Sequence, residues 1–206
     1  MRAVVWCNGQ IPSQVVVDSV IDDGVSVFGV DGGADKARGF GISVKEVLGD
    51  LDSVDRPHWG SSIRELPDQS SSDLSKSIEY LERGGYSEID VIGIEGGNLG
   101  HTIGAWASLV ETPPKITVRM HYEDSVAHRV NIHSGEFRIH IDRGEEFSIF
   151  ALERSRISIS EAKWELDDEE VGFCTLGLNN IGIGKEVAVK SNGTVVIIAS
   201  RDYSSS

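Results

Sequence analysis

Long apolar runs and basic clusters are both missing from this sequence of 206 residues. No apolar stretch approaches the roughly 18 residues that a membrane-spanning helix requires, so no membrane association is expected. The N-terminus reads directly as a strand and lacks the long apolar stretch and cleavage site of a signal peptide, so we expect a cytoplasmic protein. With 19 Lys and Arg against 33 Asp and Glu, the formal net charge is −14, which argues against a nucleic-acid partner.

Cysteine is scarce, and histidine is present without a metal-binding pattern. The two cysteines, Cys7 and Cys174, lie far apart in the chain, which argues against a disulfide framework, and each is expected to be a small buried residue. The histidines show no metal-ligand spacing. Exposed positions on strands or in loops are expected for those in the second half of the chain, namely His121, His128, His133 and His140.

The first half of the chain alternates strand and helix patterns. Residues 25–30 read as a buried strand, and residues 73–83 place apolar side chains on one face of a helix. A strand over residues 89–93 leads into a glycine-rich loop and then a helix over residues 100–110. This alternation predicts an α/β domain with a mainly parallel sheet over residues 1–113.

The pattern changes after Pro113 and Pro114. From residues 116–118 onward, short alternating runs dominate, no convincing helix appears, and Asn192-Gly193 is a strong hairpin signal. We therefore expect an all-β sandwich or barrel over residues 114–206.

Four carboxylates follow consecutive short elements of the predicted α/β domain. Asp31 follows the strand over residues 25–30, Asp50 and Asp52 follow a second short apolar run, and Asp73 begins a helix. Loops at the carboxyl ends of parallel strands gather around one crevice, so these carboxylates are expected to converge. Converging carboxylates repel one another unless a cation lies between them, and such a set suits Mg²⁺ held against the phosphates of a nucleotide.

Each of these residues also has a simpler interpretation. An acidic residue at position 73 is favoured by the helix dipole, with Ser72 as the N-cap. The Asp50-x-Asp52 pattern occurs in haloacid-dehalogenase-like phosphatases and in metal-dependent glycosyltransferases, and it also occurs in plain turns. The phosphatase interpretation requires the motif directly after the first strand, whereas two predicted strands precede it here.

Three further features leave two interpretations open. The loop over residues 93–98 lacks the ending of a P-loop, and its glycines either cradle phosphate or form a tight turn. His101, at the start of the following helix, either contacts phosphate or caps the turn. Trp164 is either a half-buried strand residue or a flat surface on which a heteroaromatic ring stacks.

Taken in order, these motifs resemble those of the thiamine pyrophosphokinase family. The family pattern runs Asp-Gly-Gly-Ala, Gly-Asp-x-Asp-Ser, Asp-Gln-x-x-Thr-Asp and Gly-Arg-x-Asp-His/Gln, followed by an all-β domain with Lys-Trp-x-Leu and a Ser-Asn turn. The corresponding segments here cover nearly the whole chain: Asp31-Gly-Gly-Ala34, Gly49-Asp-Leu-Asp-Ser53, Asp68-Gln-Ser-Ser-Ser-Asp73, Gly97-Asn-Leu-Gly-His101, Lys163-Trp-Glu-Leu166 and Gly177-Leu-Asn-Asn180.

The resemblance implies transfer of the β,γ-diphosphate of ATP to the hydroxyl of thiamine, with release of AMP. It implies that Asp50, Asp52 and Asp73 hold Mg²⁺, with Asp31 close to the metal and to the reacting hydroxyl. It also implies a homodimer whose sites combine the α/β domain of one subunit with the β domain of the other. Nucleotide or phosphate contacts are expected from Gly32, Gln69, Ser72, Gly97, Asn98 and His101, and thiamine contacts from Trp164, Asn179 and Asn180.

The glycine-rich loop departs from the family pattern. Asn98 stands where the family has Arg, and Gly100 stands where it has Asp. The lost Arg would have given bidentate phosphate contacts that Asn98 cannot replace at equal strength. Three hypotheses therefore stay open: a divergent thiamine pyrophosphokinase, a pyrophosphokinase for another heterocyclic alcohol such as a hydroxymethylpterin, and a non-catalytic protein that binds nucleotide or thiamine.

Overall fold

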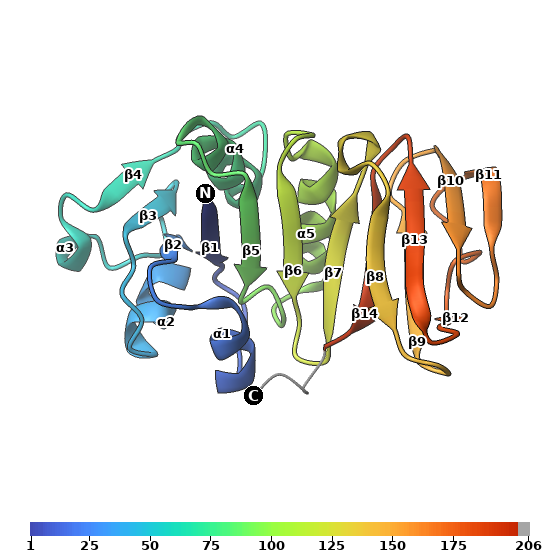
Figure 1. Ribbon diagram of the computed structural model, residues 1–206. Coiled ribbons are helices and arrows are strands. Elements are labelled where there is room, and N and C mark those ends of the chain that lie inside the picture. Colours follow the sequence, from blue (N-terminus) through green and yellow to red (C-terminus); the bar gives the residue numbers. More distant parts are fainter. Residues whose placement is uncertain (202–206) are drawn as a thin grey trace. The chain divides into compact units, whose positions relative to one another are not determined.

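The computed structural model describes residues 1–201 and divides into two compact units (Figure 1). The first unit is Met1–Glu123, and the second begins at Asp124. The predicted boundary between residues 113 and 114 therefore falls too early. Residues 116–118 were assigned to the β half, but β6 (Thr117–His121) pairs in parallel with β5 (Glu88–Ile92) and belongs to the first unit.

The first unit alternates strands with helices, as the sequence predicts. Its remaining strands are β1 (Arg2–Trp6), β2 (Ser26–Val30), β3 (Glu46–Gly49) and β4 (Ile63–Glu65). Its helices are α1 (Gln14–Val20), α2 (Gly33–Gly39), α3 (Arg56–Trp59), α4 (Asp73–Arg83) and α5 (Leu99–Glu111).

The strands of this unit form a sheet in the order β4-β3-β2-β1-β5-β6, and all of these pairings are parallel. The chain moves outward from β1 to β4 and then returns to the other side of β1 for β5 and β6. Because such crossovers are right-handed, this reversal puts α1 and α2 on one face and α4 and α5 on the other (Figure 1). The expected parallel sheet is confirmed, and its carboxyl edge is where a ligand would bind.

The second unit consists of strands and one short 3₁₀ helix. Its elements are β7 (Ser125–Val130), η1 (Ile132–Ser134), β8 (Phe137–Ile141), β9 (Glu146–Ala151), β10 (Ser155–Ser160), β11 (Leu166–Val171), β12 (Asn180–Ile181), β13 (Lys185–Ser191) and β14 (Val195–Ser200).

These strands pair antiparallel in two groups, β12-β9-β14-β7 and β11-β10-β13-β8. Both groups supply residues to one apolar core, for example Ile149 and Ile197 from the first and Ile157 and Val189 from the second. The two groups therefore face each other across a shared core, as the sheets of a β-sandwich do. The expected all-β character of this half is confirmed.

The structure also bears on the expectations about membrane spans and cysteines. Among residues 1–201, no helix has the length and apolar character needed to cross a membrane. Cys7 and Cys174 are both free thiols. Cys7 is buried as expected, but Cys174 is exposed, so the prediction of two buried cysteines is wrong for Cys174.

A buried ionic cluster ties the middle strands of the parallel sheet together. Asp90 of β5 is almost fully buried and lies 2.7 Å from Arg2 Nε, 2.6 Å from Arg119 Nε and 2.8 Å from His121 Nε2. Burial alone would raise the pKa of Asp90, but hydrogen bonds from His121, Arg119 and Arg2 together lower it well below its usual range. His121, expected to be exposed, is buried because it is a partner of this carboxylate.

We predict that Asp90→Asn lowers the free energy of unfolding by about 3 kcal/mol, because it leaves the partly buried guanidinium groups of Arg2 and Arg119 without their counter-charge. Asp22 is the matched control, since it also pairs with Arg2 but is exposed. Asp22→Asn should change stability by less than about 1 kcal/mol. Urea unfolding at pH 7 measures both, and equal effects from the two variants would contradict the assigned role of Asp90.

Candidate active site

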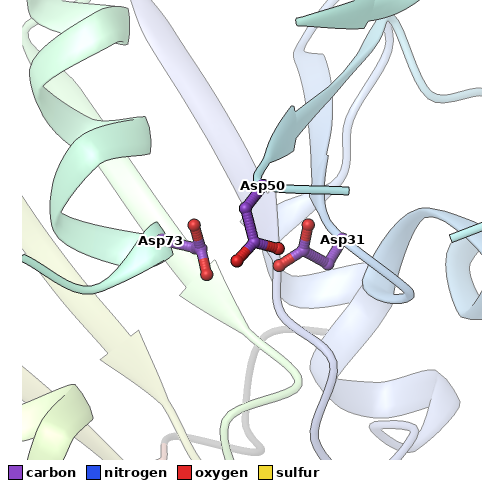
Figure 2. A group of neighbouring side chains, drawn as sticks. All are labelled: Asp31, Asp50 and Asp73. Carbon is purple, nitrogen blue, oxygen red and sulfur yellow. The ribbon is translucent and has the colours of Figure 1, made fainter. Parts of the chain in front are cut away.

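Three of the four predicted carboxylates converge at the carboxyl edge of the parallel sheet. Asp31 directly follows β2, Asp50 directly follows β3, and Asp73 is the first residue of α4. Each offers a carboxylate oxygen, and these oxygens all lie within 4.8 Å of one another. Figure 2 shows the three side chains pointing toward a common centre. The sequence prediction of convergence is therefore confirmed for these three residues.

Backbone geometry holds Asp31 in this arrangement. Its φ of +48° lies in the left-handed region, and its Oδ1 accepts a hydrogen bond of 2.9 Å from the Leu51 N–H. A Cβ on Gly49 would lie only 2.2 Å from that same oxygen. Gly49 also has a φ of +138°, which strains other residues. A glycine before Asp50 is thus required for the Asp31 carboxylate to lie where it does.

This environment changes the pKa of Asp31, which is 8% exposed. Its pKa is raised to about 7, mainly by burial and also by the nearby carboxylates of Asp73, Asp50 and Asp52, against the opposing effect of the Leu51 N–H. At neutral pH the cluster therefore holds a carboxyl group that is only partly ionised. A cation bound among these oxygens would favour the charged form.

One cation already contacts the cluster, and the sequence analysis missed it. Lys76 is 8% exposed, and its Nζ lies 2.7 Å from Asp73 Oδ1. The same ammonium donates to the carbonyl oxygens of Leu66 and Asp68 at 2.9 and 2.7 Å. Lys76 thus joins Asp73 to the loop that precedes α4. The only signal in the sequence is its i, i+3 spacing from Asp73.

Asp52 lies outside this group of three. It is exposed, and its backbone N–H donates to Asp50 Oδ1 at 3.3 Å. The next residue, Ser53, ties the same loop to the sheet, because its Oγ accepts from Asn8 Nδ2 and from the Gly32 N–H, both at 3.2 Å. Asn8 is a second position that the sequence analysis missed.

The predicted phosphate-binding residues near α4 have local roles in the structure. Ser72 caps the helix, since its Oγ accepts from the Ser75 N–H at 3.1 Å, and it also lies 2.8 Å from Ser108 Oγ. Gln69 is exposed in the loop before the helix. Gly32 lines a cavity of about 510 Å³ together with Asn8, Lys36 and Phe40. The interpretation of Ser72 as the N-cap of α4 is confirmed. Asp73 begins this helix and also belongs to the carboxylate group.

The glycine-rich loop leads directly into α5. Gly97 is exposed with a φ of +76°. Asn98 is the N-cap of α5, and its Oδ1 accepts from the His101 N–H at 3.1 Å. His101 itself is exposed. The side-chain oxygen of Asn98 is therefore occupied in holding the helix start.

The predicted thiamine-binding residues gather around a cavity in the second unit. This cavity has a volume of about 530 Å³ and is lined by Trp164, Asn179 and Asn180 together with apolar residues that include Leu176 and Leu178. Trp164 lies in the loop between β10 and β11 and is 52% exposed, so it is not a strand residue. Its exposed ring at a cavity is the arrangement that the stacking hypothesis requires.

Asn180 holds Trp164 in place. Its Oδ1 accepts from the backbone N–H of Trp164 at 3.1 Å and from that of Ile181 at 2.8 Å, while its Nδ2 donates to the Trp164 carbonyl at 2.7 Å. Asn179 has a φ of +54° and donates its N–H to Ser148 Oγ at 3.1 Å. The two asparagines thus fix the cavity wall, a role that the sequence did not indicate.

The first unit is an α/β unit with an acidic site at the carboxyl edge of its sheet. The second unit is all-β and has a cavity lined by an aromatic ring. A family model described as "Thiamin pyrophosphokinase, catalytic domain" matches residues 17–120, a segment that contains all three converging carboxylates. The chain belongs to the thiamin pyrophosphokinase family. The family predicted from the ordered motifs is confirmed.

Solved structures of such enzymes have the same fold. The thiamine pyrophosphokinase of Bacillus subtilis is 19% identical, with a TM-score of 0.79, and the match covers 98% of this chain and 100% of that one. The enzyme of Candida albicans is 14% identical, with a TM-score of 0.76 over 98% of this chain and 89% of that one. The yeast enzyme is 10% identical, with a TM-score of 0.72 and coverages of 97% and 86%. Comparison with curated proteins gave no match.

The raised pKa of Asp31 predicts how stability depends on pH without metal. A free Asp titrates near pH 3.9. Between that pH and about 7 the folded chain holds a proton that the unfolded chain has lost, so the free energy of unfolding falls as pH rises. Asp31→Asn should remove this slope and stabilise the metal-free protein at pH 8 by roughly 2–4 kcal/mol.

The measurement is urea unfolding of both proteins in EDTA at pH 5, 6.5 and 8. Asparagine suits this position because it tolerates positive φ and keeps the acceptor for the Leu51 N–H. The Asp31 assignment fails if the variant is less stable than the wild type at pH 8, or if both show the same slope.

Proposed function

We propose that this chain is a cytoplasmic enzyme that transfers diphosphate from ATP to the hydroxyl of thiamine, giving thiamine diphosphate and AMP. The observation that carries the proposal is the convergence of Asp31, Asp50 and Asp73 within the segment that matches the catalytic-domain model. Diphosphate transfer asks a protein mainly for in-line positioning and charge neutralisation, so no protein nucleophile is needed.

The residues at the carboxylate cluster fit Mg²⁺ as the cofactor. Their donors are all hard carboxylate oxygens, and the raised pKa of Asp31 reflects its burial and the carboxylates around it. We propose that Asp50 and Asp73 hold the metal, with Asp52 as the third ligand of the predicted set and Asp31 beside it. When bound, Mg²⁺ would supply positive charge to the diphosphate that is transferred.

The reaction forms one bond and breaks another at the β-phosphorus of ATP. The hydroxyl oxygen of thiamine bonds to this phosphorus, and the bond from the phosphorus to the oxygen shared with the α-phosphate breaks. AMP leaves with that oxygen, and the hydroxyl proton is released. The proposed contacts to nucleotide and phosphate are Gly32, Gln69, Ser72, Gly97, Asn98 and His101. The cavity that Gly32 lines supports its place in this set.

Thiamine would occupy the cavity of the second unit. The exposed ring of Trp164 offers a stacking surface, and a cationic thiazolium ring is attracted to such a surface. Asn180 fixes the backbone of Trp164, and Asn179 shares the cavity wall. These three residues therefore remain the proposed thiamine-binding set.

We further propose a homodimer with composite sites, as the family resemblance implies. Support comes from exposed apolar side chains in each unit. Helix α5 exposes Leu99, Ile103 and Val110, whose spacings of four and seven residues put them on one face of the helix. The loop after β11 exposes Phe173 and Leu176. Contiguous exposed apolar surface is typical of sites that another protein covers.

The direct test is release of AMP from ATP and Mg²⁺ with thiamine or hydroxymethylpterin as acceptor, with the products identified by mass. Thiamine diphosphate with AMP is the expected result. AMP released with the pterin alone would reassign the acceptor. Binding of ATP and thiamine in calorimetry without any AMP would instead indicate a non-catalytic binding protein.

We predict that Asp50→Asn lowers turnover by roughly a hundredfold to a thousandfold while the fold persists, because a member of the assembled carboxylate group loses its charge. The same loss is expected for Asp52→Asn, because the proposed metal loses a ligand. Asp23→Asn removes an exposed carboxylate at the end of α1 and should leave turnover unchanged. Steady-state kinetics and circular dichroism check this, and near-wild-type turnover in the Asp50 variant would disprove the metal assignment.

Subunit complementation tests the composite site. Asp50→Asn and Trp164→Ala alter different units of the chain and should each be inactive. If one site uses the two units of different subunits, then co-refolding the two variants should restore about a quarter of wild-type activity, since half of the dimers are mixed and each has one intact site. No restoration, despite mixed dimers proven by mass spectrometry, would mean that each site lies within one chain.

A further inference from the structure

A single acidic residue lines the cavity of the second unit. Among the described residues that line this cavity, Glu165 is the one with an ionisable side chain, and most of the others are apolar. Glu165 follows Trp164 directly, so the carboxylate and the aromatic ring belong to the same short loop. The cavity therefore combines an aromatic surface, apolar walls and one negative charge.

The Glu165 carboxylate is anchored but not neutralised. Its Oε1 accepts a hydrogen bond of 2.7 Å from the Glu161 N–H, which fixes the end of the side chain beside Glu161. The basic residues nearby pair with other acids: Lys185 with Glu161, Arg156 with Asp168, and Arg154 with Glu170. Within residues 1–201, no basic side chain forms an ion pair with Glu165.

A cation already lies against the aromatic part of this loop. Lys163 Nζ lies 4.4 Å from the centre of the Trp164 ring, a cation–π geometry. Lys163 is not among the cavity-lining residues. The ring thus attracts positive charge within the protein itself, while the charge on the cavity side comes from Glu165.

We infer that Glu165 is a specificity-determining residue, which makes this cavity select a positively charged heterocyclic ring over a neutral ring of the same shape. The inference rests on the proposed function, because it names the property of thiamine that the cavity recognises. Its physical basis is charge complementarity, in which an unpaired carboxylate beside an apolar wall attracts a cation and offers nothing to a neutral ring. The unpaired acids on β11, such as Asp167, would add only a weak and screened attraction.

The test compares thiamine with its neutral analogue in which a thiophene replaces the thiazolium ring. Calorimetry on the full chain gives Kd for both ligands, so the test does not depend on turnover. Glu165→Gln keeps the acceptor for the Glu161 N–H and removes only the charge. The matched control is Asp167→Asn, which removes one exposed charge on the neighbouring strand without touching the cavity.

We expect Glu165→Gln to weaken thiamine binding roughly five- to tenfold and to leave the Kd of the neutral analogue within about twofold. Asp167→Asn should leave both values within about twofold. Lys163→Gln should strengthen thiamine binding, because it removes a competing cation beside the ring.

Three results would overturn the inference: equal losses for both ligands in Glu165→Gln, equal effects of the Glu165 and Asp167 variants, or a wild-type protein that binds neither ligand. The proposed function fails separately, in the assay for AMP. A wild-type protein that prefers thiamine to the neutral analogue but releases no AMP would keep the role of Glu165 and overturn the proposed catalysis.

Discussion

Repulsion among like charges is the constraint around which the first unit is built. Repulsion among three carboxylates with oxygens within 4.8 Å of one another opposes folding, so other contacts must hold them together. Two features do so here: Gly49 leaves room for the Asp31 carboxylate, and the Leu51 N–H fixes it. Lys76 offsets part of the charge at Asp73. The pKa of Asp31 is still raised, by burial and by the neighbouring carboxylates, so a bound cation would favour its charged form.

The sequence predicted the structure best where a residue pattern allows only one structural interpretation. The helix predicted over residues 73–83 matches α4, because its apolar spacing and the glycines after it are unambiguous. The convergence of Asp31, Asp50 and Asp73 followed from topology alone. Lys76, the steric role of Gly49 and the ionic partners of Asp90 were missed, since each depends on which distant residues the fold brings near. The boundary after residue 123 was missed because β6 alternates like the strands that follow it.

In the second unit, the sequence pointed to three residues that line one cavity, but not to the contacts that hold them. Trp164 was predicted as a stacking surface, and its exposure at a cavity agrees with that prediction. Asn180 was expected to face the ligand, yet its amide is bonded to the backbone of Trp164 and Ile181. Gly177 packs so closely on β9 that a Cβ would lie 2.3 Å from the Ile149 carbonyl oxygen. The hydrogen bonds from Asn180 fix the backbone of Trp164, which lowers the entropy lost when a ligand stacks on its ring.

In the glycine-rich loop, the departure from the family pattern preserves the start of the helix but not the charge. Asn98 stands where the family has Arg, and it is a favoured N-cap residue that bonds the His101 N–H and starts α5. The substitution thus keeps the loop and helix in place while it removes a positive charge. The N-terminus of α5 still presents backbone N–H groups with a favourable dipole, but these attract phosphate less strongly than a guanidinium does. Charge neutralisation in this chain would therefore depend more on the metal that we propose for the carboxylates, which links the intact acidic cluster to the altered loop.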